Sequence, residues 1–391
     1  MICLLRSYKT ELDVTEKQAD KINQTIGVCR YMYNFYLTHS KLLYEQGQSF
    51  MSGRIFSVWF NNEYLPEHPE LSWVKSVSSK SVKQSIENAY TAFRRFFEKR
   101  SGYPCFKKKG ISDPKIYFVK NNPKDCLCER HRIKIPTLGW VKIKEKGYIP
   151  TTKQGFTIRS GTITKQAGRY YISVLVEIPD IDISKFSYSD GIGIDLGLKE
   201  FAVCSNGIAY QNINKTAIIR TLEKRLRREQ RKFSRKHEAL KKSKKGKAAQ
   251  RLNITKQKRK IQRIHQRLTN IRTDYINKVI AEIVRAKPSY ITIEDLNVQG
   301  LMKNRHLSKS VASQKFYEFR RKLQQKCKEY GIELRIADRF YPSSKTCHHC
   351  GIINHALKLS ERTYKCLCGY EADRDYNASL NLRDTTIYKL A

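Results

Sequence analysis

Residues 192–204 read Ile-Gly-Ile-Asp-Leu-Gly-Leu-Lys-Glu-Phe-Ala-Val-Cys. They lie at the start of a domain whose residue pattern differs from that of the preceding segments. The first six residues are typical of a buried strand, and the last five are followed by a Ser-Asn-Gly turn and a short apolar run, a pattern that indicates a hairpin. Asp195 lies in the middle of the first strand, between Ile194 and Leu196. Because burying a charge costs free energy, this carboxylate needs a functional or structural reason.

The elements downstream of this hairpin alternate between helices and strands. The pattern predicts a helix near 275–286, a strand at 289–293, a helix at 311–330 and a strand at 333–337. Strands that alternate with helices after an opening hairpin indicate an α/β core.

Further acidic residues follow two apolar or cysteine-rich segments. Glu294 comes directly after the apolar run 290–293, at the carboxyl end of a predicted strand, which is the usual position of sites in α/β sheets. Asp373 and Asp375 follow a cysteine-rich segment near the C-terminus. Three carboxylates that converge on such a sheet can hold two Mg²⁺ ions about 4 Å apart, an arrangement that hydrolyses phosphodiesters. Taken singly, each acid could equally serve as a helix cap or a salt-bridge partner.

The two neighbouring acids are distinguished by helical spacing. If a last helix begins near Arg374, Asp375, Ala378 and Leu382 share one face, and that face packs on the sheet that carries Asp195. Asp373 then precedes the first turn and is placed as a helix cap. We therefore assign Asp375 to the carboxylate site and Asp373 to the cap.

Four cysteines near the C-terminus have the spacing of a metal site. Cys347 and Cys350 are separated by two residues, Cys366 and Cys368 by one, and 15 residues lie between the pairs. Four thiolates can enclose a tetrahedral Zn²⁺ and leave no open position, so we predict a structural zinc site. Because the second pair has a short spacer, His348 or His349 could replace Cys366. The pair Cys126 and Cys128, with His131, lacks a second pair nearby, and we assign it to structure or chance.

The composition points to a polyanionic partner. The chain has 391 residues, 40% of them hydrophobic, and its 76 Lys and Arg against 36 Asp and Glu give a formal charge of +40. Such self-repulsion excludes an ordinary metabolic enzyme as the default and favours phosphate-rich partners. No stretch approaches 18 uncharged apolar residues, and the cysteine usage argues against a secreted disulfide scaffold. We expect a cytoplasmic protein that associates with the nucleoid.

The charge is concentrated in residues 220–272, which hold 22 Lys and Arg against 3 acidic residues, a net charge of +19. Apolar residues still recur there at spacings of three, four and seven, in two sets on either side of Gly246. This predicts a helical hairpin with an apolar seam and basic outer faces. We assign Arg227, Arg228, Lys258 and Arg259 on those faces to nucleic-acid contact.

The N-terminal part combines a strand, helices and a β domain. Residues 2–12 read as a strand, Thr15 and Gln18 have capping-box spacing, and a helical pattern runs to about Arg100. Residues 104–185 contain short alternating runs interrupted by Pro and Gly, which indicates a small antiparallel barrel that the first strand could join.

Two rival interpretations come from single motifs. The Gly-Ile-Asp-Leu-Gly sequence also resembles the first phosphate loop of actin-like and sugar-kinase folds, but the second Asp-Gly-Gly loop that those folds need is absent from the sequence. A plain binding protein whose zinc ribbon docks on DNA is a weaker rival.

Several motifs taken together resemble those of TnpB, the transposon-encoded RNA-guided nuclease family related to the type V CRISPR effectors. They are the segments Arg30–Tyr36, Gln84–Phe97, Gly102–Lys107, Gly193–Val203, Ile293–Leu301, Ser343–Gly351 and Cys366–Leu382. The last three are specific in combination and in order, and the resemblance covers nearly the whole chain.

The resemblance implies a multidomain α+β fold. Its parts are a helical recognition lobe, a small wedge-like β-barrel, and an RNase H-like α/β nuclease core of the RuvC type with an inserted zinc ribbon. We place the first barrel strand at 1–13, the recognition domain at 14–103 and the remaining barrel at 104–186. The nuclease core spans 187–343 with the basic hairpin at 214–286, the ribbon 344–371, and the end of the core 372–391.

The resemblance also implies a function. The protein would be a transposon's RNA-guided DNA endonuclease that cuts target DNA beside a short adjacent motif, with Asp195, Glu294 and Asp375 as its catalytic, Mg²⁺-binding triad. The implied cofactors are two Mg²⁺ ions, or Mn²⁺ in their place, one structural Zn²⁺ held by Cys347, Cys350, Cys366 and Cys368, and a guide RNA. The implied partners are guide RNA and target DNA, for a monomer or weak dimer.

Lys80 and Gln84 are candidates for reading the adjacent motif. They lie four residues apart at the start of a predicted helix, so both can point the same way, and Gln can pair with an adenine edge. The family places motif-reading residues on the corresponding helix. The alternative function is a nuclease-inactive RNA-guided repressor or a transposition accessory factor, whose signature would be the loss of one of the three acids.

Overall fold

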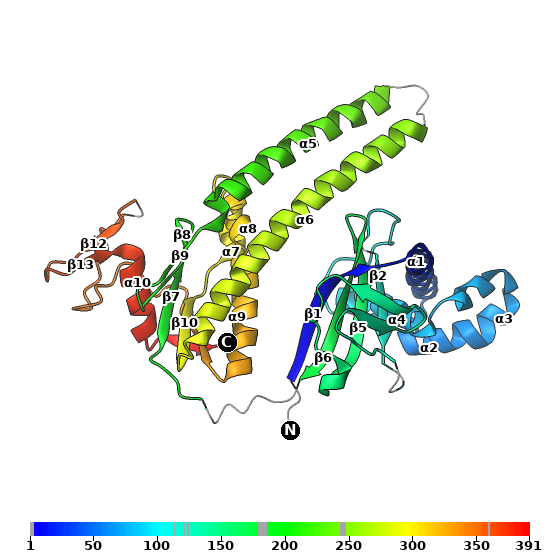
Figure 1. Cartoon of the computed structure of the whole chain (residues 1–391), viewed down its shortest axis with the longest axis horizontal. Helices are drawn as coiled ribbons and strands as arrows, with labels where there is room; N and C mark the ends of the chain where they lie inside the picture. Colours follow the sequence, from blue (N-terminus) through cyan, green and yellow to red (C-terminus); the bar gives the residue numbers. More distant parts are fainter. Residues whose placement is uncertain are drawn as a thin grey trace. The chain divides into compact units, whose positions relative to one another are not determined.

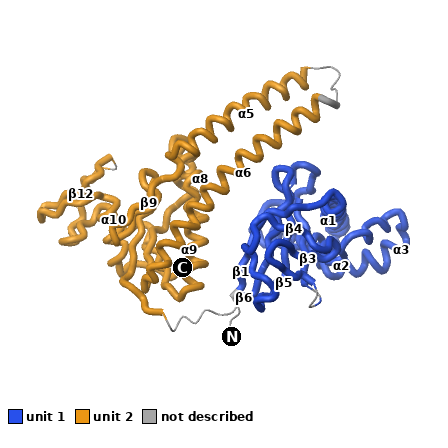
Figure 2. The backbone as a smooth tube through the Cα atoms, in the orientation of Figure 1, with its two compact units in different colours: residues 1–180 blue, residues 181–391 orange. Residues whose placement is uncertain are grey.

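The computed structural model describes residues 4–112, 114–120, 122, 125–178, 186–242, 248–358 and 360–391. The chain divides into two compact units, residues 1–180 and 181–391 (Figure 2). Gly246, predicted to separate two helices, lies outside the described residues. Within the described ranges, no helix combines the length and apolar character needed to cross a membrane.

The first unit contains a six-stranded antiparallel sheet with the order β2-β5-β6-β1-β4-β3. Its strands are β1 (Leu4–Asp13), β2 (Lys115–Val119), β3 (Arg132–Ile135), β4 (Gly139–Ile143), β5 (Thr157–Gln166) and β6 (Arg169–Ile178). Ile116 of β2 and Ile133 of β3, on the two edge strands, belong to one hydrophobic core. The sheet therefore curves around a shared interior, but its order is open at β2 and β3, so the closed barrel stays a prediction.

Helices occupy the chain between β1 and β2. They are α1 (Glu16–Glu45), α2 (Gly53–Trp59), a π-helical turn (Phe60–Tyr64), α3 (Leu65–Glu67), a 3₁₀ segment (Pro69–Ser76) and α4 (Ser79–Phe97). Thr15 and Gln18 form the expected capping box at the start of α1. The apolar faces of these helices meet in a second core rich in aromatic side chains, among them Tyr36, Phe56 and Phe93.

The second unit is organised around a mixed six-stranded sheet with the order β14-β11-β10-β7-β8-β9 (Figure 1). The strands are β7 (Ile192–Leu196), β8 (Glu200–Cys204), β9 (Ala209–Gln211), β10 (Tyr290–Glu294), β11 (Glu333–Ala337) and β14 (Tyr388–Leu390). The strands β7, β8 and β9 form the predicted antiparallel hairpin series, whereas β7, β10 and β11 are parallel.

Helices cover both faces of this sheet. The helices of this unit are α5 (Ala217–Lys242), α6 (Ala248–Arg285), α7 (Val298–Lys303), α8 (Ser308–Gln314), α9 (Phe316–Tyr330) and α10 (Arg374–Asp384). Residues of α6 and α9 share one core with the apolar side chains of β7, β10 and β11, while α10 packs on β7, β8 and β10.

Two expectations about these helices were wrong in detail. The helix expected near 275–286 is the C-terminal end of the 38-residue α6, because the amphipathic pattern continues without a break from the hairpin. The helix expected at 311–330 is divided into α8 and α9 by Lys315, whose φ of 58° cannot continue a right-handed helix.

The cysteine-rich segment lies between β11 and α10. It contains the two-stranded sheet β12 (Thr363–Lys365) and β13 (Glu371–Asp373), which pair antiparallel. Short 3₁₀ turns also occur at Thr152–Gln154 and Ile213–Lys215.

Candidate active site and cysteine cluster

Asp195 lies on the face of the sheet that α10 covers. Side chains alternate along a strand, and Ile192, Ile194 and Leu196 of β7 point into the core shared with α6 and α9. Gly193 therefore faces α10, where a Cβ atom would lie 2.0 Å from the Ser379 carbonyl oxygen. Only glycine permits this close approach of strand and helix, and it brings Asp195, on the same face, beside α10. Ala378, which helical spacing placed on the face of α10 that packs on the sheet, is fully buried; Gly193 was not singled out from the sequence.

Glu294 lies on the same face of the neighbouring strand. Thr292 of β10 is the register partner of Gly193 in the parallel pair β10/β7, so Glu294, two residues further along, lies beside Asp195. The hydroxyl of Ser343, in the chain after β11, donates a hydrogen bond of 2.6 Å to Glu294 Oε1. Ser343 is therefore a positioning residue for Glu294, and the sequence signal that could have revealed it is the Ser-Ser-Lys-Thr-Cys motif.

Asp373 and Asp375 occupy the start of α10 in the way that the spacing predicted. Asp373 is the N-cap, and its Oδ1 accepts hydrogen bonds from the backbone N–H groups of Asp375 (2.9 Å) and Tyr376 (3.2 Å). Asp375 is in the first turn of α10. Its Oδ1 lies 3.4 Å from Arg374 Nη2, and its Oδ2 lies 3.9 Å from Arg362 Nη1. The cap prediction is confirmed, and it fixes the helix end from which Asp375 projects.

The three acids influence each other electrostatically. Burial raises the pKa of Asp195 well above its ordinary value, and the negative charges of Glu294 and Asp375 raise it further. Burial also raises the pKa of Glu294, against the lowering effect of the Ser343 hydrogen bond, and Asp375 adds to the rise. Buried carboxylates that repel one another are a donor set suited to a divalent cation.

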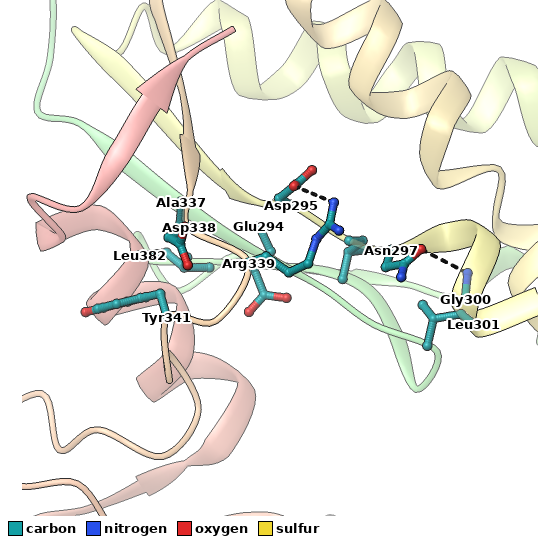
Figure 3. A pocket seen from close by; sticks show the side chains of 11 residues that line it. Glu294, Asp295, Asn297, Gly300, Leu301, Ala337, Asp338, Arg339, Tyr341 and Leu382 are labelled. Atoms are coloured by element: carbon teal, nitrogen blue, oxygen red, sulfur yellow. Dashed lines mark hydrogen bonds and ion pairs between the residues drawn. The ribbon is translucent and has the colours of Figure 1, made fainter.

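A cavity of about 350 Å³ adjoins this site at the carboxyl ends of β10 and β11 (Figure 3). Glu294 and Arg339 both line it. In Figure 3 the carboxylate of Asp295 is directed towards Arg339, and the carboxylate of Glu294 points away from that of Asp295. The cavity gives a ligand access to Glu294.

Asp295, which the sequence analysis did not single out, organises one wall of this cavity. It accepts hydrogen bonds of 2.8 Å from Arg320 of α9 and from Arg339, and Lys389 lies 3.7 Å away. Although burial alone would raise the pKa of Asp295, the hydrogen bonds from the two arginines lower it below its ordinary value. Asp295 therefore stays charged and ties β10 to α9 and to the loop after β11.

The four cysteines converge. Their sulfur atoms all lie within 4.8 Å of one another, and no other group of potential ligands within the described ranges meets this criterion. The pairs Cys347–Cys368 and Cys350–Cys366 are 3.7 Å and 3.5 Å apart. Cys350 is followed by Gly351, with a φ of 76°, and Cys368 is followed by Gly369, with a φ of 88°. Each glycine closes a tight turn.

The short spacer of the second pair does not prevent convergence. Cys366 reaches the cluster, so neither His348 nor His349 is needed as a ligand. The backbone N–H of Cys368 lowers the pKa of Cys366 to about 7, which favours the thiolate that binds metal. The cluster fits a structural zinc ion.

The cysteine segment is linked to the carboxylate site through α10. The side-chain amide of Asn377 donates to the Thr346 carbonyl (2.7 Å), and Asn381 donates to the carbonyls of Ser343 (2.8 Å) and Thr346 (2.7 Å). The backbone N–H of His348 donates to Asn377 (3.1 Å). These hydrogen bonds join the first cysteine turn to the helix that bears Asp375 and to the serine that holds Glu294.

The pair Cys126 and Cys128 belongs to the core of the first unit. Both thiols are buried among apolar side chains, and burial raises the pKa of each to about 11. Neutral buried thiols agree with the assignment of this pair to structure.

The residues proposed for nucleic-acid contact lie on exposed helix surfaces. Lys80 is exposed on α4, and Gln84, half-buried one turn later, donates to Asn88 Oδ1 (3.1 Å). Arg227 and Arg228 on α5 and Lys258 and Arg259 on α6 are exposed.

The hairpin of α5 and α6 has an apolar seam near its base, where Ile219, Leu222, Ile264 and Leu268 are buried. Further along the hairpin, the buried Gln257 donates hydrogen bonds to the backbone and side chain of Glu229. Figure 1 shows the hairpin extending from the sheet of its unit.

Comparison with known proteins finds three family models that match parts of this chain. Residues 173–305 match a family model described as "Probable transposase", residues 316–382 match "Cas12f1-like, TNB domain" and residues 1–49 match "Helix-turn-helix domain". A Streptomyces pristinaespiralis protein named as an RNA-guided DNA endonuclease is 30% identical over 96% of this chain and 88% of its own length. The Escherichia coli K12 protein InsQ, named in the same way, is 28% identical over 97% and 91%.

The fold is also found in a solved structure. The protein in a cryo-EM structure of a Cas12f1-sgRNA-target DNA complex superposes with a TM-score of 0.58 at 14% identity, over 99% of this chain and 100% of that chain.

Proposed function

Because the chain belongs to the TnpB family of transposon-encoded RNA-guided DNA endonucleases, we propose that it is such an endonuclease and cuts target DNA beside a short adjacent motif. The reaction is the hydrolysis of a DNA phosphodiester. Family membership alone would not establish activity, since family members that have lost a catalytic acid could bind DNA without cutting it.

The observation that supports cutting is that three intact acids lie near enough for their charges to affect one another's ionisation. Asp195 and Glu294 lie side by side on β7 and β10, and the charge of Asp375 on α10 raises the pKa of both. A binding protein has no use for buried carboxylates that repel one another, because they destabilise the fold. A nuclease does, because such carboxylates bind the cations that hydrolysis needs.

We assign Asp195, Glu294 and Asp375 as ligands of two Mg²⁺ ions. When bound, these ions supply an activated water and stabilise the leaving oxygen of the phosphodiester. The protein's own contribution is to hold the acids in place. Ser343 orients Glu294, and the Asp373 cap fixes the turn that presents Asp375.

The sheet topology supports an RNase H-like core of the RuvC type. Three antiparallel strands, β7 to β9, are followed by the parallel strands β10 and β11, and the acids lie on the first strand, the fourth strand and a late helix. The cysteine cluster, inserted before that helix, is proposed as the zinc ribbon of this domain.

Guide RNA and target DNA are the proposed partners. The charge of +40 and the exposed basic residues of the hairpin, Arg227, Arg228, Lys258 and Arg259, suit phosphate backbones rather than base edges. Lys80 and Gln84 on α4 are proposed to read the adjacent DNA motif, and Asn88, which accepts from Gln84, extends this face by one turn. A monomer or weak dimer remains our expectation.

The test starts from RNA that co-purifies with the protein, which is sequenced to define the scaffold and the guide end. The complex is then rebuilt with a guide of chosen sequence and supplied with plasmids that carry the matching target beside randomised flanks. We expect cleavage that needs Mg²⁺, a matching target and one flanking motif. Binding to the matched target without cleavage would overturn the proposal and favour the repressor.

A further inference from the structure

Phe340 is held in solvent directly beside the candidate active site. The residue is 87% exposed, although large aromatic side chains are normally at least partly covered. A single exposed apolar residue needs no explanation by itself. What distinguishes Phe340 is the position of its ring and the fixed backbone that carries it.

The backbone around Phe340 forms a hydrogen-bonded turn. The N–H of Phe340 donates to Asp338 Oδ1 (2.8 Å), and the N–H of Tyr341 donates to the Asp338 carbonyl (3.1 Å). The N–H of Ser343 donates to the Tyr341 carbonyl (2.8 Å), and the Tyr341 hydroxyl donates to the Asn381 carbonyl of α10 (3.3 Å). The ring is thus presented by a braced loop, which lowers the entropy cost of binding.

This loop borders the catalytic acid. Arg339 and Tyr341, the two neighbours of Phe340, line the cavity that Glu294 also lines. Ser343 bonds Glu294 directly, and three residues of chain span at most about 11 Å. Phe340 therefore lies at the rim of the cavity, within reach of nucleotides next to a phosphate bound at the acids.

The surroundings of Phe340 suit a nucleobase. The two residues before Phe340 are Asp338 and Arg339, both charged and exposed. A flat aromatic ring offers a stacking surface to any base, whatever its sequence. Inside a duplex both faces of a base are covered by its neighbours, so only an unstacked base can use such a ring.

We propose that Phe340 stacks on an unstacked base of the DNA strand being cut, next to the scissile phosphate, and so positions that strand at Glu294. This inference rests on the proposed function. Phe340 is a substrate-binding residue at the active site, and it acts after the target has been bound through the guide.

The test compares Phe340→Ala, Phe340→Trp and Tyr317→Ala in the rebuilt RNA complex. Tyr317 is a matched control, since it is an aromatic residue of the same unit, 72% exposed, on α9. Because losing one stacked base costs a factor of about ten or more, we expect Phe340→Ala to slow cleavage of bound target about tenfold. Guided DNA binding should be unchanged, Phe340→Trp should restore the rate, and Tyr317→Ala should cut like the wild type.

A second measurement identifies the contact. Targets with a single abasic site at successive positions around the cut are given to the wild type and to Phe340→Ala. We expect one position where the abasic site slows the wild type about as much as Phe340→Ala does, and where it adds nothing in the variant. Wild-type rates in Phe340→Ala, or losses that multiply at every position, would overturn the inference alone. A wild type that binds target but does not cut would overturn the proposed function, and the inference with it.

Discussion

The second unit holds two clusters of potential metal ligands that are built in opposite ways. The four thiols come from two short turns between Cys347 and Cys368. Each turn supplies one pair, and the contacts Cys347–Cys368 and Cys350–Cys366 join the two turns within this one segment. The three carboxylates come from β7, β10 and α10, and the packing of the helix on the sheet brings them near one another. The thiol cluster is therefore local and the carboxylate cluster is tertiary.

This difference predicts different consequences of damage. Leu367, between two of the cysteines, is fully exposed, and Tyr364 is the large side chain buried in this segment, so metal should add to what holds the turns together. The carboxylates are held by a core that forms without them, so their loss should spare the fold. Removing a thiol should damage structure first and cutting second, while removing a carboxylate should damage cutting alone.

The largest effect is expected for Asp375→Ala. Cleavage should fall below detection while guided DNA binding survives, because the acids are proposed to hold cations and not the RNA–DNA duplex. Cleavage and gel-shift assays on the same preparation, with Mg²⁺, measure both properties. Full cutting by this variant would show that the third catalytic acid is another carboxylate.

Loss of one thiol should give the next largest effect. The wild type should hold roughly one zinc ion per chain. Cys347→Ser or Cys350→Ser should lose this zinc and lower the melting temperature of the second unit. Cutting should then fail, because the hydrogen bonds from Asn377 and Asn381 to this segment are disturbed. Elemental analysis and thermal melts are the measurements.

Cys105→Ser provides the matched control for the thiol variants. Cys105 is an exposed free cysteine in the first unit, so its replacement should leave zinc content and melting temperature unchanged. Less than about half an equivalent of zinc in fresh wild-type protein would contradict a structural site.

Asp195→Asn should raise stability by several degrees in protein stripped of divalent cations. A carboxyl whose pKa is higher in the folded than in the unfolded protein loses stability as the pH rises from its unfolded value towards its folded value. The pKa of Asp195 is raised by burial and by Glu294 and Asp375, so the gain should be present at neutral pH and vanish in acid.

Thermal melts in EDTA across this pH range check the prediction. Asp274→Asn is the control, because Asp274 is an exposed residue paired with Lys278 on α6, and its loss should change little. Equal melting temperatures for wild type and Asp195→Asn at neutral pH would mean that the acids do not repel one another.

The smallest effect is expected for Asp373→Ala. Removing the N-cap should cost about 1 kcal/mol, or about 2–4 °C in a unit of this size, and leave measurable cutting. The side-by-side assay with Asp375→Ala decides between the two acids. Abolition of cutting confined to Asp373→Ala would reverse their roles.

Local signals in the sequence were reliable where one element determines the outcome. The capping box of Thr15 and Gln18, the cap at Asp373, the strand at 333–337 and the cysteine spacing were all predicted. Each depends on residues a few positions apart, whose relation is fixed by the geometry of one turn, helix or strand. The helix expected at 311–330 was divided because a single backbone angle at Lys315 leaves no periodic signal.

The sequence alone determined which residues could form each cluster, the excess of positive charge and the order of the elements. Only the tertiary structure decided that Gly193 lets α10 approach β7, that Ser343 holds Glu294, and that Asp295 gathers Arg320, Arg339 and Lys389. These contacts join segments far apart in the chain. Their partners are selected by the packing of sheet and helix, and residue spacing carries no record of that packing.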